Sequence, residues 1–367
     1  MVAKPDAPPH EDPTPELREL RAIRMLLTGV FLIALFSTFF FARALLLPIV
    51  LAIIVSLTLR PVVRGLQNLG VPSPVSAVGL VVGLGALLIF GGVWASGPAR
   101  RLVARAPEIA FEVRWKLRGL IESFGRMQEM SEEFADLAEG GSAEVQEVVL
   151  EQSGLVTDIV GSLAGAGTSL VAALILAMFL LASWDFFLRR IVEEAPRFQD
   201  KKRAMAIARD LEHQISRYLA AITVINAGLG LAIGLALWAV GLPNPHLWGI
   251  AAFVLNYLPF LGAIAGTIGV AMVALVTFDT AGQALLAPLA YYTLTSLEGQ
   301  VVTPLMLGRQ LALNTVAVFV TVMLWVWLWG IAGAFLAVPV LVIVKVVSDY
   351  LPPLQGFGRF LEGRTRA

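Results

Sequence analysis

Long runs of apolar residues recur along this 367-residue chain, and they constrain its fold more than any other feature. A run of roughly 20 apolar residues is enough for a helix to cross the hydrocarbon core of a bilayer. Hydrophobic residues make up 57% of the chain and charged residues only 15%, whereas soluble domains carry roughly 25% charged residues. Because a lipid-embedded segment must satisfy its own backbone hydrogen bonds, such runs are expected to be helical. The sequence therefore predicts an all-α polytopic membrane protein embedded in a lipid bilayer.

Changes in composition divide the chain into regions that together contain about eight segments of membrane-spanning character. The first residues are rich in proline and charge. The stretch after the third segment has apolar residues at helical spacing among many charges, which predicts amphipathic helices outside the bilayer. The predicted regions are a cytoplasmic disordered tail (1–24), three N-terminal transmembrane helices (25–96), an extracytoplasmic amphipathic helical insert (97–158), the fourth span with a cytoplasmic basic interfacial helix (159–218), a C-terminal core with discontinuous helices (219–350) and a cytoplasmic tail (351–367).

The uneven distribution of basic residues predicts the orientation in the membrane. Eight of them lie within residues 189–217, whereas residues 97–158 contain seven basic and twelve acidic residues, a balance of −5. The cytoplasmic loops of membrane proteins are enriched in Lys and Arg. Both termini and residues 185–217 are therefore predicted to be cytoplasmic, and the insert to be extracytoplasmic.

Two apolar stretches in the C-terminal core are interrupted by Gly and Pro, and the pieces are too short to cross a bilayer alone. They cover residues 241–279 and 314–345, and they contain the related sequences GAIAG and GIAG. Paired interruptions of this kind are typical of discontinuous helices and predict two broken, re-entrant hairpins. The alternative is that Gly and Pro merely bend ordinary spans. The predicted hinge and turn positions are Pro259, Gly262, Gly266, Pro304, Gly308, Gly330, Gly333 and Pro339.

Residues 219–344 contain only three charged residues, which are Asp279, Glu298 and Arg309. Asp279 lies in a polar break and fits a loop or helix start, whereas Glu298 follows one apolar run and precedes another. An ionised carboxylate is costly in hydrocarbon, so an intramembrane acid ordinarily faces a cavity or a partner. Glu298 is therefore the leading candidate for a pathway residue, the alternative being a position at the membrane edge. Arg309 either folds back to pair with Glu298 or anchors on lipid headgroups.

Two asparagines beside the interrupted stretches complete the candidate site. Asn256 precedes Pro259, and Asn314 opens the last apolar stretch. Both are expected to cap helix ends, because free backbone N–H groups find no water inside a membrane.

The sequence lacks the motifs of catalysis, metal binding and cofactor binding. It has no cysteine, and its three histidines are far apart without the spacing of metal ligands. A phosphate-binding loop and a nucleophilic-serine motif are also missing, so neither a nucleotide-driven pump nor an enzyme is expected. We expect no metal, no cofactor and no nucleic-acid partner.

Three stretches of the C-terminal core carry a family resemblance: NYLPFLGAIAG (256–266), LEGQVVTPLMLGRQLALNTVAVF (297–319) and WGIAGAFLAVPV (329–340). Together they resemble the autoinducer-2 exporter family of bacterial inner-membrane transporters, formerly an uncharacterised permease family. The resemblance implies several hydrophobic segments of which some are re-entrant, and assembly into homo-oligomers, with pentamers expected. It also implies transport of small molecules or ions across the bacterial inner membrane.

Three hypotheses for function remain at this point. The leading one is a secondary transporter or facilitator that exports a small polar molecule, such as an autoinducer-2-like signal or a related metabolite. The second is a monovalent cation/proton antiporter in which Glu298 carries the proton, since burial can raise the pKa of a carboxyl group. The third is a non-transporting membrane scaffold whose insert binds a partner. The sequence leaves the substrate, the direction of transport and the coupling ion open.

Overall fold

The computed structural model describes residues 15–132, 153–193, 198–259, 261–307 and 313–362. These residues form helices joined by turns, and their one β-type pairing is an isolated bridge between Leu313 and Glu362. Within them, six helices are long and apolar enough to cross a membrane. The all-α prediction is therefore confirmed, and the chain is a polytopic helical membrane protein.

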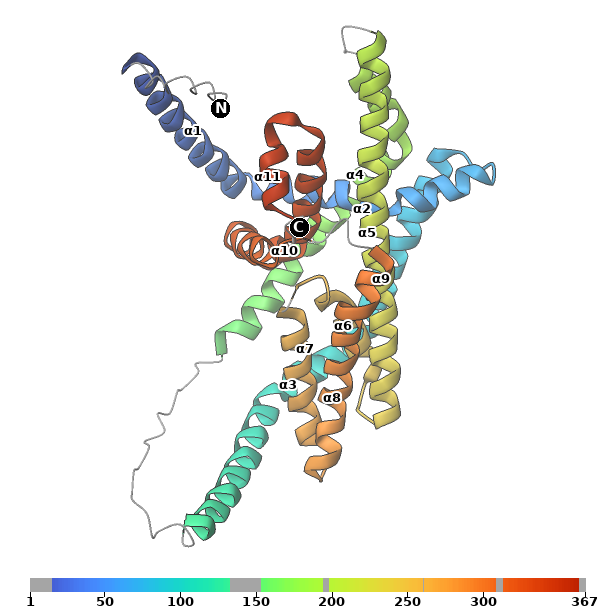
Figure 1. Cartoon of the computed structure of the whole chain (residues 1–367). Helices are drawn as coiled ribbons and strands as arrows, with labels where there is room; N and C mark the ends of the chain where they lie inside the picture. Colours follow the sequence, from blue (N-terminus) through green and yellow to red (C-terminus); the bar gives the residue numbers. More distant parts are fainter. Residues whose placement is uncertain (1–14, 133–152, 194–197, 260, 308–312, 363–367) are drawn as a thin grey trace, which may run out of the picture.

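The N-terminal part consists of three long helices. Helix α1 (Pro15–Phe41) projects away from the other helices in Figure 1, and Ala42 alone separates it from α2 (Arg43–Asn68). Helix α3 (Ser73–Glu132) contains 60 residues and includes Pro98 and Pro107. The third span and the beginning of the predicted insert are thus one continuous helix. Residues 133–152 of the insert lie outside the described part of the chain.

The next two helices pack against α2. Helix α4 (Ser153–Glu193) meets α2 through fully buried alanines, Ala52 on α2 and Ala173 and Ala177 on α4. Helix α5 (Phe198–Val240) begins at the top of the view in Figure 1 and runs downward from there. The predicted basic interfacial helix and the fifth span are therefore parts of one helix.

The first interrupted stretch forms a hairpin of two short helices, α6 (Pro245–Leu255) and α7 (Leu261–Thr277). Backbone hydrogen bonds close the turn, since Leu258 N donates to Leu255 O at 2.8 Å and Gly262 N donates to Leu258 O at 2.9 Å. A Cβ atom on Gly262 would lie 1.9 Å from Leu255 O, so only glycine permits this close approach. Pro259 lies within the turn, as predicted.

The second interrupted stretch is helix α10 (Thr315–Tyr350), which folds back on itself at Gly330. Gly330 has φ 63° and ψ −141°, a conformation open to glycine and strained for other residues. A Cβ atom on Gly333 would lie 1.9 Å from Trp325 O. The two arms, residues 315–329 and 331–350, pack side by side because Ala317, Val318 and Val322 of the first arm meet Ala337 and Leu341 of the second. Both predicted interruptions are therefore helical hairpins.

The prediction of a hinge at Pro339 is wrong, because Pro339 lies buried inside the second arm of α10. The helix folds back at Gly330 instead. Asn314 caps α10 as predicted, since its side-chain oxygen accepts a hydrogen bond of 2.9 Å from Val316 N. The chain then ends with a short 3₁₀ helix, η2 (Pro352–Leu354), and α11 (Gln355–Phe360). These return to the start of α10, where Asn314 N donates to Leu361 O at 2.9 Å.

Between the two hairpins, α8 (Ala281–Leu297) continues into a π-helix, η1 (Glu298–Val302), and then into α9 (Thr303–Leu307). The prediction that Pro304 turns the chain is wrong, because Pro304 lies inside α9. A proline has no N–H and clashes with the carbonyl four residues earlier, which here belongs to Gln300. The wider π-helix places this carbonyl differently and lets the chain stay helical. Gly308 lies outside the described residues.

Candidate functional site

Glu298 is the first residue of the π-helix η1, and its side chain is only 8% exposed. π-helical segments are rare and occur frequently at functional sites. The π-helix also changes which residues lie on the same helix face as Glu298, because the backbone N–H of Thr303 bonds to Glu298 O, five residues earlier. The predicted candidate acid is therefore buried at a local irregularity of the backbone.

Both carboxylate oxygens of Glu298 accept hydrogen bonds from neutral side chains. Asn256 Nδ2 donates to Oε2 at 3.2 Å, and Thr303 Oγ1 donates to Oε1 over a short distance. The same Asn256 amide also donates to Asn226 Oδ1 at 2.8 Å. The hydrogen bonds join α5, the α6–α7 turn and the segment that follows α8.

Two further residues extend these contacts along α5. Tyr257 OH donates to Thr223 Oγ1 at 2.9 Å, one helical turn before Asn226. Asn226 is fully buried, and its Nδ2 has no hydrogen-bond partner among the described residues. An unsatisfied buried donor costs about 1–3 kcal/mol, and the Asn226 side chain also interacts with the hydroxyl of Tyr257. We call this set the Glu298 cluster, comprising Thr223, Asn226, Asn256, Tyr257, Glu298 and Thr303.

The Glu298 cluster differs from the predicted site in two ways, and a third predicted residue lies outside the described part of the chain. Asn256 belongs to it, but the expectation that Asn256 caps a helix with its side chain is wrong, because this side chain bridges α5 and η1. Asn314 caps α10 and lies outside the cluster. Arg309 lies in residues 308–312, outside the described part of the chain, so its pairing with Glu298 stays a prediction.

Asn226 and Thr303 are additions that sequence reasoning missed. Asn226 is an amide inside the apolar run LAAITVINAGLGLAIG, and an unexplained polar residue in such a run is a usable signal. Thr303 gave no such signal, because its alignment with Glu298 depends on the π-helix.

Gly266, one of the predicted hinge positions, lies against α8 instead of at a bend. A Cβ atom there would lie 2.0 Å from the hydroxyl of Tyr291, which is itself buried. The glycine thus lets α7 pack closely on α8 just before the chain reaches Glu298.

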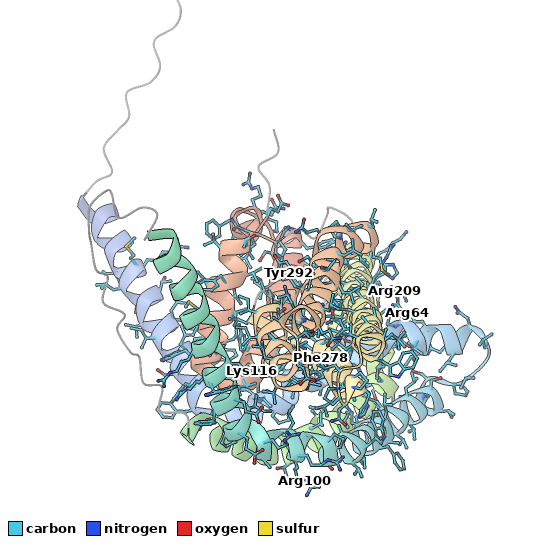
Figure 2. The ribbon with its side chains drawn as sticks, turned by 90° about the horizontal axis from the view of Figure 1, so that it is seen from below. Arg64, Arg100, Lys116, Arg209, Phe278 and Tyr292 are labelled. Atoms are coloured by element: carbon cyan, nitrogen blue, oxygen red, sulfur yellow. The ribbon has the colours of Figure 1, made fainter. Side chains whose placement is uncertain are left out.

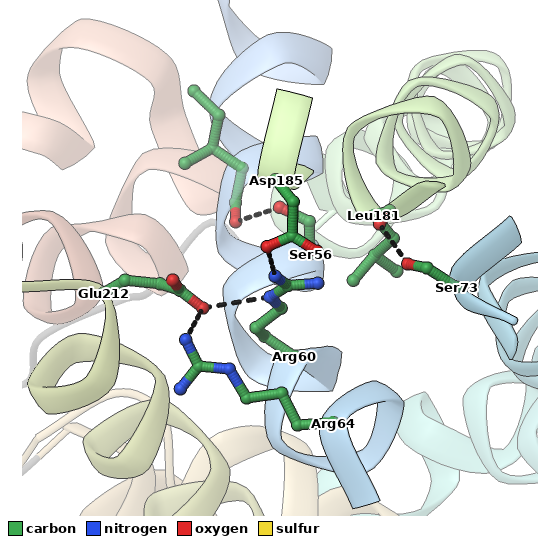
Figure 3. Close-up of polar contacts among 8 residues, drawn as sticks. Ser56, Arg60, Arg64, Ser73, Leu181, Asp185 and Glu212 are labelled. Atoms are coloured by element: carbon green, nitrogen blue, oxygen red, sulfur yellow. Dashed lines mark hydrogen bonds and ion pairs between the residues drawn. The ribbon is translucent and has the colours of Figure 1, made fainter. Parts of the chain in front are cut away.

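A separate group of charges, around Glu212, holds the helices together just before the apolar run of α5 begins. Arg60 Nε donates to Glu212 Oε1 at 2.9 Å, and Arg60 Nη2 contacts Asp185 Oδ1 at 2.5 Å, while Arg64 Nη2 lies 2.8 Å from Glu212 Oε1. Figure 3 shows this network joining α2, α4 and α5. Arg60 and Glu212 have buried side chains, so we assign the network a structural role.

Lys345 forms a third polar group within the second arm of α10. Its ammonium contacts Asp349 Oδ2 at 2.6 Å and Glu362 Oε1 at 3.2 Å. The contact to Glu362 ties the residues after α11 to the α10 hairpin. In the described residues, no group of three or more His, Cys, Asp or Glu side chains is arranged to hold a metal ion.

Comparison with known proteins agrees with the predicted family. The model of the AI-2E family transporter matches residues 30–352. The chain is 25% identical to the AI-2 transport protein TqsA of Escherichia coli over 320 residues, covering 84% of this chain and 87% of that protein. It is 26% identical to the "Putative transport protein YhhT" of Escherichia coli over 329 residues, covering 88% and 90%. It is also 28% identical to a "Putative transport protein" of Borreliella burgdorferi over 200 residues, covering 54% of this chain and 55% of that protein.

Proposed function

Because this chain belongs to the AI-2E transporter family, we propose that it is a secondary transporter or facilitator that exports a small polar molecule through a pathway containing the Glu298 cluster. The substrate class rests on the similarity to TqsA, whose name states transport of AI-2. The proposed location is the bacterial inner membrane, with both termini cytoplasmic and several copies assembled together, pentamers being expected from the family resemblance. The basic residues of segment 189–217 support the orientation.

The observation that carries the proposal is a buried carboxylate whose hydrogen-bond partners among the described residues are neutral, namely Asn256 at the tip of the α6–α7 hairpin and Thr303 in α9. Among the described residues, no basic side chain pairs with Glu298, and its acceptor oxygens bind Asn256 and Thr303. A hydrogen bond to a charged group is worth about 1.5–3 kcal/mol, whereas removing one partner of a buried ion pair costs about 3–5 kcal/mol, so the neutral partners of Glu298 are the easier ones to exchange. A polar solute with hydroxyl groups can replace Asn256 at Glu298 and accept a hydrogen bond from Asn226 Nδ2.

The hairpin supplies the movement that such an exchange requires. Asn256 lies at the end of α6, so a shift of the α6–α7 turn breaks its bonds to Asn226 and Glu298 together. In this proposal, the turns of the hairpins lie within the membrane and line a polar pathway. Membrane proteins tolerate non-helical backbone at such positions, where it lines a cavity and does not face lipid.

Efflux from proteoliposomes tests the proposal. Vesicles containing wild-type protein and preloaded with AI-2 are compared with vesicles containing Glu298→Gln or Asp279→Asn. The matched control removes the exposed carboxylate between α7 and α8. We expect Glu298→Gln to lose at least about tenfold in rate, the equivalent of about 1.4 kcal/mol, and Asp279→Asn to keep the wild-type rate. Equal rates in all three would exclude Glu298 from the mechanism.

A cation/proton antiporter is a second candidate, favoured by the same lack of a described basic partner at Glu298. A carboxylate without such a partner suits a proton carrier. In everted vesicles, this candidate predicts collapse of a pH gradient when Na⁺ or Li⁺ is added, and loss of the response in Glu298→Gln. AI-2 efflux without any cation-dependent proton movement would favour the exporter instead.

A further inference from the structure

A cavity of about 350 Å³ lies where α3 crosses the start of α6 and the last turns of α7, and it shares no residue with the Glu298 cluster. Its wall is largely apolar. Leu102 and Ile109 contribute from α3, Trp248 from α6, and Val273 and Val276 from α7. This wall is continuous with the buried core around Ile109.

Two guanidinium groups from successive turns of α3 line the same cavity. Arg101 forms no ion pair with any residue in the described part of the chain, and Arg105 approaches Glu108 only to 3.6 Å at an exposed position. Asn244 also lines the cavity. It has φ 52° and makes no side-chain cap on α6, so its amide is available to a ligand. The N-terminus of the eleven-residue helix α6, which follows directly, adds partial positive charge.

Two backbone carbonyls at the C-terminal end of α7, close to the cavity residues Val276 and Thr277 in sequence, are already engaged. Lys116 Nζ contacts Leu275 O at 2.6 Å and Phe278 O at 3.3 Å, which occupies carbonyls at the C-terminal end of α7. Figure 2 shows Lys116 beside Phe278, with Arg100 further along α3. The cavity is thus electropositive at its rim and apolar in its depth.

We propose that this cavity binds one anionic phospholipid, with its phosphate on Arg101 and Arg105 and the first part of its acyl chains against the apolar wall. Arginine binds phosphate oxygens in a bidentate geometry, and the apolar residues from α3, α6 and α7 offer a surface for acyl chains beside the two guanidinium groups. A free phosphate ester shares the anionic chemistry, but it would leave the apolar wall exposed to water. The bound lipid bridges α3, α6 and α7 and so braces the hairpin that carries Asn256. This proposal stands independently of the transported solute.

Thermal unfolding of the purified full chain in neutral detergent tests the proposal. The apparent Tm is measured with added phosphatidylglycerol, phosphatidylethanolamine or soluble glycerol phosphate. We expect only phosphatidylglycerol to raise the Tm. The double variant Arg101→Ala/Arg105→Ala is expected to lose this rise, and the matched control Arg100→Ala/Arg114→Ala, which removes two exposed arginines of the same helix outside the cavity, is expected to keep it.

Three outcomes would overturn the lipid site. They are an equal rise in both double variants, an equal loss in both, and a rise with glycerol phosphate as large as with phosphatidylglycerol. Both cavity arginines are exposed, so the lipid-free Tm of the double variant is expected to match the wild type. Should that variant not fold, the single variant Arg101→Gln is measured in the same way, and an undiminished rise there also overturns the proposal.

Discussion

The side-chain amide of Asn256 connects three parts of the molecule that are distant in sequence. It donates to Asn226 Oδ1 on α5 and to Glu298 Oε2 on η1, while its own backbone ends α6. One primary amide nitrogen carries two hydrogens, so it can make both bonds at once. Asn256 therefore fixes the position of the hairpin tip relative to the buried acid.

Replacing Asn256 by alanine is expected to destabilise the protein by about 1–3 kcal/mol, because two buried acceptors lose their donor. The measurement is the free energy of unfolding in mild detergent. Asn68→Ala is the matched control, since Asn68 is an exposed asparagine at the end of α2, and surface changes of this kind stay within about 0.5 kcal/mol. Equal effects of the two substitutions would show that the Asn256 bonds contribute nothing.

At the scale of elements, both hairpins depend on glycines at which another backbone approaches closely. Gly262→Ala and Gly333→Ala each place a methyl group 1.9 Å from a carbonyl oxygen, of Leu255 and Trp325 respectively. Each change is expected to lower the Tm and the transport rate, because the turn must open to make room. Gly228→Ala on α5 meets nothing within 4 Å, so it is expected to be neutral or stabilising by up to about 1 kcal/mol. Wild-type behaviour of Gly262→Ala and Gly333→Ala would contradict the close packing of the hairpins.

The ion network of Figure 3 holds α2, α4 and α5 together through charged side chains. Arg60→Ala is expected to cost about 1.5–3 kcal/mol, the worth of a hydrogen bond to a charged group, because it leaves the buried Glu212 with Arg64 alone and Asp185 with no partner in the network. Arg64 is 37% exposed, and Glu212 keeps Arg60 when Arg64 is removed. Arg64→Ala is therefore expected to cost at most about 1 kcal/mol. Comparable unfolding free energies for the two variants would contradict the assignment of Arg60 as the central residue.

At the scale of the whole molecule, the features that local sequence encodes were the ones that could be predicted. Gly330 and Asn314 produce a break and a cap through their own backbone and side-chain preferences, so both were recognisable. The Glu298–Asn256 and Asn256–Asn226 contacts span 42 and 30 residues, and the Arg60–Glu212 contact spans 152. Such pairings are fixed by helix packing, and sequence reasoning found Glu298 without its partners.

The continuity of α3 is a second feature that local sequence did not predict, because a boundary was expected where the helix continues. The change in composition near residue 97 favoured a boundary between the third span and the insert. Instead, the helix continues and its charged part packs on α6 and α7, where Lys116 binds carbonyls of the α7 end. A proline is tolerated when tertiary contacts hold the helix on both sides of it, and those contacts are invisible in the local sequence.

The most direct test of the central claim uses the absence of cysteine from the chain. A single cysteine at Thr303 places a thiol beside Glu298, and labelling by a small hydrophilic thiol reagent in native membranes reports whether water reaches the cluster. Ala287→Cys, in the closed core, is the control. We expect the thiol at position 303 to be labelled, AI-2 to slow this labelling, and the thiol at position 287 to stay unlabelled. A thiol at position 303 that stays unlabelled with and without AI-2 would contradict a pathway through the Glu298 cluster.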